Sequence, residues 1–164
     1  MIERILESFC QLLRIVLGIL TAALIIPVAM QVLARYTGII PVYLWTEELA
    51  TFIFIWMVMV GSMIAVWEGT HFDVHVVPEA ATPLGRFLQS GFVLLMISIF
   101  ALLFSFYGFG YAKFGSIQQS VMMQANLLVT YITVPLAGIG WAIFALFRLW
   151  QSLQNYRQER RTVS

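Results

Sequence analysis

Two adjacent carboxylates, Glu47 and Glu48, are the residues whose type and spacing best suit acid–base chemistry in this sequence. They follow Trp45 and Thr46 and come directly before a long apolar run. General acid–base catalysis needs a reacting group within reach, such as a nucleophile or a bound metal. No candidate for either adjoins the pair, so we expect a structural or binding role and no enzymatic activity.

The structural alternative is that Glu47 and Glu48 open a helix. Thr46 is then a plausible N-cap whose hydroxyl accepts a free backbone N–H, and the two carboxylates lie in the first turn, where the helix dipole favours negative charge. The binding alternative is that one carboxylate pairs with a partner protein or with Arg35. Arg35 and Tyr36 end the preceding apolar run, so an Arg35–Glu47 or Arg35–Glu48 pair is geometrically reasonable.

A second candidate cluster, His71, Asp73 and His75, follows the second apolar run. An extended chain would place these three side chains on one side, where they could ligate zinc. Three ligands within five residues of a loop are not a zinc signature, so we expect no metal. Gly69 is expected to supply the turn after the helix and His71 a hydrogen bond within the loop. Haem held between the helices would need histidines at membrane depth. Both histidines lie outside the predicted spans, so we expect no cofactor.

The composition excludes a water-soluble globule. The 164 residues are 61% hydrophobic and 10% charged, whereas a soluble domain is about half apolar and about a quarter charged. A chain this short cannot hide so much apolar surface from water, so its solvent is lipid. The net charge of +1 suggests no nucleic-acid partner.

Charged residues divide the chain into apolar runs, each long enough for a membrane-spanning helix of about 20 residues. We therefore predict an all-α membrane protein with four transmembrane helices in a single membrane domain, residues 1–164. The predicted spans are residues 13–35, 47–67, 86–112 and 126–148, the last following a polar connector. Pro27 and Pro135 are expected to bend the first and fourth spans.

Orientation follows from arginine and lysine, which are in excess on cytoplasmic flanks. One side of the predicted spans holds Arg4, Arg14, Arg86, Arg148, Arg157, Arg160 and Arg161. The other side holds Arg35 and Lys113. We therefore predict that the N and C termini are cytoplasmic, with the C-terminal arginines against anionic lipid.

Small residues recur along the third span at intervals of three, four and seven. The set is Gly91, Ser98, Ala101, Ser105, Gly108 and Ala112. Small residues at this spacing let helix backbones approach closely in lipid, so this face is expected to pack on another helix. The neighbour is either a helix of the same chain or one of a second subunit.

No Asp, Glu, Lys, Arg or His lies deep within any of the predicted spans. Proton- and ion-coupled carriers usually keep such groups within the membrane to move the coupling charge. The sequence therefore indicates a helper subunit of a solute transporter. The alternative is a self-sufficient small four-helix carrier, a class that resembles shorter chains with a membrane-embedded glutamate.

Three segments carry a family resemblance. The first span ends Gln31-Val32-Leu33-Ala34-Arg35-Tyr36, the second begins Trp45-Thr46-Glu47-Glu48-Leu49-Ala50, and Gly69-x-His71 follows it. Their order and spacing resemble the small membrane subunit, of DctQ type, of tripartite ATP-independent periplasmic (TRAP) transporters. The detailed resemblance covers about the first half of the chain. The family often has a Val-Asp pair a few residues after the histidine, whereas here the acid comes earlier, as Asp73.

The resemblance implies a non-catalytic scaffold in a sodium-coupled uptake system for organic acids, such as C4-dicarboxylates or sialic acids. It implies two protein partners, a large DctM-type membrane subunit and a periplasmic substrate-binding protein, and a multi-pass location in the bacterial inner membrane. The residues expected at the subunit interface or at the docking site of the binding protein are Arg35, Tyr36, Trp45, Glu47 and Glu48.

Overall fold

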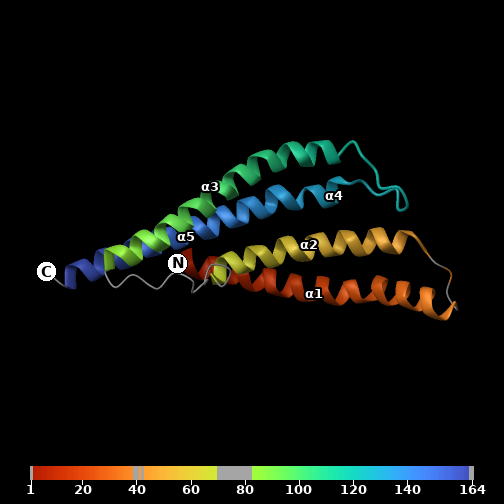
Figure 1. Ribbon diagram of the computed structural model, residues 1–164, viewed down its shortest axis with the longest axis horizontal. Helices are drawn as coiled ribbons and strands as arrows, with labels where there is room; N and C mark the ends of the chain where they lie inside the picture. Colours follow the sequence, from red (N-terminus) through yellow and green to blue (C-terminus); the bar gives the residue numbers. More distant parts are fainter. Residues whose placement is uncertain (1, 39–40, 42, 70–82, 163–164) are drawn as a thin grey trace.

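The computed structural model describes residues 2–38, 41, 43–69 and 83–162. Its helices are α1 (Ile2–Thr37), α2 (Trp45–Glu68), α3 (Pro83–Gly115), α4 (Leu128–Tyr131) and α5 (Thr133–Thr162) (Figure 1). Within these residues four helical stretches are long and apolar enough to cross a membrane: Glu3–Thr37, Trp45–Glu68, Leu88–Gly115 and Leu128–Gln154. The prediction of an all-α protein with four such helices is confirmed.

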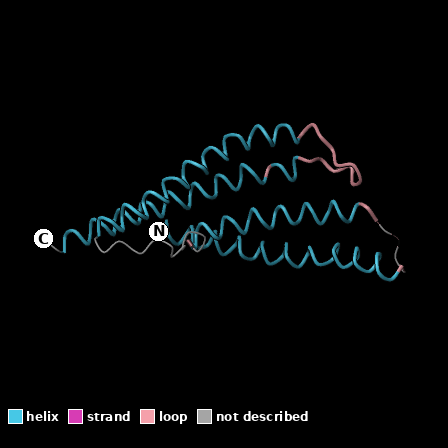
Figure 2. Tube along the Cα trace, in the orientation of Figure 1, coloured by secondary structure: helices cyan, strands magenta, loops and turns pink. Residues whose placement is uncertain are grey.

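The long helices form a row. Their main contacts run from α1 to α2, from α2 to α5 and from α5 to α3, so α1 and α3 occupy the two outer positions. The last turn of α1, the first turn of α2 and the α3–α4 loop lie at one end of the row, whereas α1 begins and α5 ends toward the other (Figure 2). We call these the loop end and the terminal end. The row leaves one side of α1 and one side of α3 uncovered by this chain.

The buried core lies between α1, α2 and α5. Its members are Cys10, Leu13, Val60, Met63, Ile64, Val66, Ala137, Phe144 and Ala145. Phe144 is fully buried, with its ring centroid 6.0 Å from that of Phe9 and 5.2 Å from that of Trp67. Aromatic pairs at these distances contribute beyond the area that they bury. This cluster holds the N-terminal part of α1 against the middle of the row.

Gly69 ends α2, as the sequence predicts. Its backbone is left-handed, with a φ of 74°, and its N–H donates to the carbonyl oxygen of Ala65 at 2.9 Å. Only glycine adopts this conformation at little cost. The Arg148 guanidinium lies against the same glycine, where a β-carbon would collide with it. Gly69 therefore serves both the backbone turn and the approach of α5.

Pro135, which was expected to bend the fourth span, lies close to a one-residue break in it. The break separates α4, which ends at Tyr131, from α5, which begins at Thr133. A proline ring clashes with the carbonyl four residues earlier and lacks an N–H, and the residue four before Pro135 is Tyr131. In the first turn of α5 the missing N–H costs little, since that group has no partner within the helix there.

Candidate functional site

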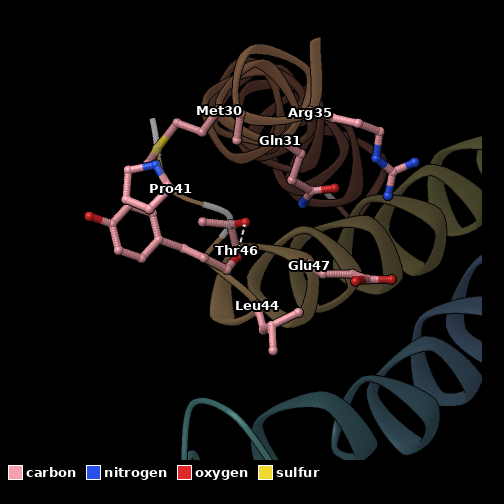
Figure 3. Close-up of a pocket in the computed structure, with 9 residues that line it drawn as sticks. Met30, Gln31, Arg35, Pro41, Leu44, Thr46 and Glu47 are labelled. Atoms are coloured by element: carbon pink, nitrogen blue, oxygen red, sulfur yellow. Dashed lines mark hydrogen bonds between the residues drawn. The ribbon is translucent and has the colours of Figure 1, made fainter. Parts of the chain in front are cut away.

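A small pocket lies at the loop end, between the last turns of α1 and the first turn of α2 (Figure 3). Its volume is about 40 Å³, and it is lined by Met30, Gln31, Ala34, Arg35, Pro41, Tyr43, Leu44, Thr46 and Glu47. The helical hairpin formed by α1 and α2 thus brings Arg35 and Glu47 to one site, although they are twelve positions apart in the sequence.

Arg35 and Glu47 line this pocket without forming an ion pair. Figure 3 shows the two side chains extending toward the same side, Arg35 from α1 and Glu47 from α2. Among the described residues, the ion pair within 4.0 Å joins Arg14 to Glu68 instead. Both Arg35 and Glu47 are exposed, so the pocket presents one positive and one negative group that another molecule can reach.

Two aromatic residues were also predicted for this site, Tyr36 and Trp45, and both are exposed. Tyr36 is 83% exposed at the end of α1, and Trp45 is 40% exposed at the start of α2. The Trp45 ring lies 6.2 Å from that of Tyr43. Aromatic side chains with one apolar and one polar part suit a membrane–water boundary or a protein interface.

Thr46 does not cap α2, and this prediction was wrong. The helix begins one residue earlier, at Trp45, and its N-cap residue Leu44 provides no side-chain cap. Thr46 therefore lies inside the first turn, where its hydroxyl donates to the carbonyl oxygen of Tyr43 at 2.7 Å. The side chain is 2% exposed and contributes to packing beneath the pocket.

Glu48 binds the loop between α3 and α4. Its Oε1 accepts a hydrogen bond from the N–H of Met122 at 3.0 Å, and its Oε2 accepts one from the N–H of Met123 at 2.8 Å. Hydrogen bonds to an ionised acceptor are stronger than neutral ones. The two acidic neighbours thus differ in role: Glu47 lines the pocket and Glu48 joins the two halves of the chain.

Two tryptophans also connect α2 to the second half of the chain. The indole N–H of Trp56 donates to the carbonyl oxygen of Val129 at 3.0 Å, and that of Trp141 donates to the hydroxyl of Ser62 at 3.1 Å. Sequence reasoning missed these contacts. The available signal was that a tryptophan inside an apolar span needs a hydrogen-bond acceptor for its N–H.

The small residues of α3 lie mostly against α5. Ser98, Ala101 and Ala112 are buried. A β-carbon at Gly108 would lie 2.8 Å from the backbone nitrogen of Pro135. On the facing helix, a β-carbon at Gly138 would lie 2.7 Å from the backbone nitrogen of Ser105. The structure therefore brings these α3 positions together on a helix of the same chain.

Gly91 differs from the other five α3 positions. A β-carbon built on it would meet nothing within 4 Å. Gly91 lies near the terminal end, where α3 begins. Beside it, α3 contacts α5 through a hydrogen bond between the hydroxyls of Ser90 and Ser152 at 3.3 Å. The backbones of α3 and α5 therefore approach each other closely only from Ser98 onward.

The terminal end carries a second group of charges. Arg14 and Glu68 form an ion pair at 2.7 Å, and the Arg148 guanidinium donates to the carbonyl oxygen of Val66 at 3.4 Å. A cation is favourable at a helix C-terminus, which is where Arg148 meets α2. His71, Asp73 and His75 lie outside the described residues. The described part of the chain contains no group of three potential metal ligands.

The sequence matches the family described as "Tripartite ATP-independent periplasmic transporters, DctQ component" over residues 24–155. The match includes the α1–α2 pocket and the α3–α5 contact, and it extends the resemblance into the second half of the chain. None of the curated proteins compared matches this chain. A family match over most of the chain shows membership, and the family is one of non-enzymatic transporter subunits. The chain therefore belongs to the DctQ family and is the small, multi-pass membrane component of a TRAP transporter.

Proposed function

We propose that this chain acts as a static scaffold in a sodium-coupled TRAP transporter that takes up organic acids, such as C4-dicarboxylates or sialic acids. The observation that carries the proposal is the placement of charge. Arg14, Glu68 and Arg148 mark one level of the helices, and Arg35 and Glu48 mark the other. Between them the sequence has no Asp, Glu, Lys, Arg or His, the side chains that usually move a coupling charge within the membrane.

The contacts between the two halves support a static role. Trp141, Trp56 and Glu48 each form a hydrogen bond from one half to the other at a different height along α2. A close-packed interior resists deformation, and the Gly108 contact allows little sliding of α3 on α5. In this proposal the moving parts of the transporter belong to the large DctM-type subunit.

The proposed orientation has both termini in the cytoplasm and the chain in the bacterial inner membrane. Arg14 and Arg148 contact the last turn of α2, at the terminal end. Arg35 and Lys113 lie in the last turns of α1 and α3, at the loop end. An excess of arginine marks the cytoplasmic side. The loop end then faces the periplasm, where the substrate-binding protein of the family would dock.

The family implies two protein partners, and we propose that the α1–α2 pocket contributes to one of these contacts. Arg35 and Glu47 are exposed and unpaired with each other, and Tyr36 and Trp45 are exposed at the same two helix ends. Arginine and aromatic side chains are enriched in protein interfaces. Glu48 contributes indirectly, because it holds the neighbouring α3–α4 loop.

The test is reconstitution. The tagged chain is purified from its native membranes in mild detergent, and the co-purifying proteins are identified by mass spectrometry. A stoichiometric large polytopic protein is expected. Proteoliposomes containing both proteins, with the periplasmic binding protein added, should accumulate an organic acid when an inward sodium gradient is imposed. Proteoliposomes containing either membrane protein alone should not.

Recovery of this chain alone as a monodisperse homo-oligomer would contradict the scaffold proposal and favour the small-carrier alternative. Uptake by the large subunit alone, at the rate of the pair, would show that the scaffold is dispensable. Uptake that is indifferent to sodium would leave the subunit assignment in place and overturn the proposed coupling ion.

A further inference from the structure

The loop between α3 and α4 presents apolar side chains to its surroundings. We call residues 116–127 the α3–α4 hairpin, because Gln119 and Asn126 form an antiparallel bridge within it. Ile117 is 80% exposed and Val121 is 75% exposed. From its six polar side chains the sequence alone suggests an ordinary aqueous connector, so the exposure of these two residues is unexpected.

Several polar groups of the hairpin bond to one another. The Asn126 amide donates to the carbonyl oxygen of Ser116 at 3.0 Å and accepts from the N–H of Leu128 at 2.8 Å. The Ser120 hydroxyl is buried and accepts from the N–H of Ala125 at 3.3 Å. These internal bonds make the polar groups of the hairpin less dependent on water, whereas water disfavours the exposed side chains of Ile117 and Val121.

The backbone of the hairpin is also largely satisfied from within the protein. Protein acceptors are present for the N–H groups of Ser116, Ile117, Gln118, Ser120, Met122, Met123, Ala125, Leu127 and Leu128. Internal partners of this kind allow irregular backbone to approach the acyl chains, which offer no hydrogen-bond partners of their own. The carboxylate of Glu48 supplies two of these acceptors.

The hairpin lies at the depth of the span ends. Glu48, in the first turn of α2, contacts its tip, and the stacked rings of Tyr111 and Tyr131, with centroids 4.2 Å apart, lie on the helices that lead into and out of it. Aromatic residues favour the membrane–water boundary. Phe114, three residues before Ile117 in the last turn of α3, is also exposed. Exposed apolar side chains therefore run from the end of a span into the hairpin.

We propose that the α3–α4 hairpin is an interfacial membrane anchor, with Ile117 and Val121 inserted between the headgroups and acyl chains of the leaflet at the loop end. Lipid fits better than a protein partner because this chain already satisfies most of the hairpin's backbone N–H groups and because the hairpin directly follows a membrane-spanning helix. The anchor fixes the height of the α3–α4 connection, and through Glu48 it fixes the height of the α2 N-terminus.

The test uses the full chain in vesicles of phosphatidylethanolamine and phosphatidylglycerol. Single cysteines replace Ile117 or Val121 in a Cys10→Ala background and carry a nitroxide spin label. Gln119→Cys is the matched control, since Gln119 is an exposed polar residue of the same hairpin. Power-saturation electron paramagnetic resonance then compares collisions of each label with oxygen, which concentrates in lipid, and with a water-soluble nickel chelate.

Labels at positions 117 and 121 should collide several-fold more with oxygen than with the nickel chelate, and the label at 119 should show a lower ratio. Equal access of the nickel chelate to all three labels would place the hairpin in water and overturn the proposal. Labels at 117 and 121 that collide with neither reagent would mean that protein covers them, which also overturns it. The high exposure of both side chains makes misfolding a minor concern, and elution as a single species checks it.

Discussion

The carboxylate of Glu48 accepts a hydrogen bond from the backbone N–H of Met123 at 2.8 Å, across 75 positions of sequence. With its second bond to Met122 at 3.0 Å, this contact joins the start of α2 to the α3–α4 hairpin. Glu48 therefore links the two halves of the row at the loop end, next to the bond from Trp56 to Val129 on α4. Its neighbour Glu47 makes no such link and lines the α1–α2 pocket instead.

The first prediction concerns this link. Glu48→Ala should lower the thermal unfolding midpoint of the detergent-solubilised chain, because the two backbone N–H groups lose their acceptor. Glu48→Gln should have an intermediate effect, since one neutral oxygen replaces two charged ones and hydrogen bonds to charged acceptors are the stronger. Glu47→Ala is the control and should leave the midpoint nearly unchanged. Equal midpoints for Glu48→Ala and Glu47→Ala would show that the link contributes nothing to stability.

The second prediction concerns the backbone contact between α3 and α5. Alanine at Gly108 would place a β-carbon 2.8 Å from the backbone nitrogen of Pro135, and overpacking of this kind typically costs about 1–3 kcal/mol. Alanine at Gly91 meets nothing within 4 Å and gains up to about 1 kcal/mol of helix propensity. Denaturant unfolding should therefore rank Gly91→Ala above the unsubstituted chain and Gly108→Ala below it.

Both substitutions are glycine to alanine in one helix, so the propensity gain is shared and their difference isolates the packing term. If the two variants unfold at the same denaturant concentration, α3 does not approach α5 as closely as described. The variants also separate packing within the chain from assembly, because Gly108→Ala should lower stability even without the large subunit.

The third prediction concerns Gly69, where α2 ends against Arg148. Gly69→Ala forces an alanine into the left-handed region, at a φ of 74°, which costs roughly 1–2 kcal/mol. It also displaces the Arg148 guanidinium. Gly38→Ala is the matched control, because Gly38 has a φ of 64° and open space around it. Thermal unfolding should show a larger loss for Gly69→Ala, and a similar loss for both variants would mean that Arg148 adjusts freely.

Composition and the spacing of charges were sufficient to predict the four spans, because the cost of burying a charge in lipid confines arginine and glutamate to the span ends. The same charges bound apolar runs and not always helices. Arg14 comes directly before the first apolar run, and α1 continues N-terminally past it to Ile2. The pair that Arg14 forms with Glu68 marks the end of α2, not the start of α1. Hydrogen bonding within a helix does not stop where an apolar run stops.

The detailed geometry of the site depended on which helices become neighbours. Arg35 and Glu47 could be placed together because a short connector joins their helices. The partners of Glu48 could not, since they lie in a hairpin that is brought close only by the packing of α2 against α4 and α5. Local signals also misled: Thr46 has the residue type of an N-cap, but Trp45 already occupies the first helical position.

The last prediction concerns the α1–α2 pocket. Arg35→Ala with Glu47→Ala should lower sodium-driven uptake by the reconstituted transporter several-fold, because both charges line one pocket, reach solvent and do not neutralise each other. The thermal midpoint of the isolated chain should not change, since neither side chain holds the row together. Lys113→Ala is the control, because Lys113 is an exposed cation at the same end of the molecule, on α3. Arg35→Ala, Glu47→Ala and Lys113→Ala are also tested singly. Loss of uptake in all three would indicate a general requirement for charge at the loop end. Full uptake by the double variant, with the complex intact on size exclusion, would remove the pocket from the proposed interface.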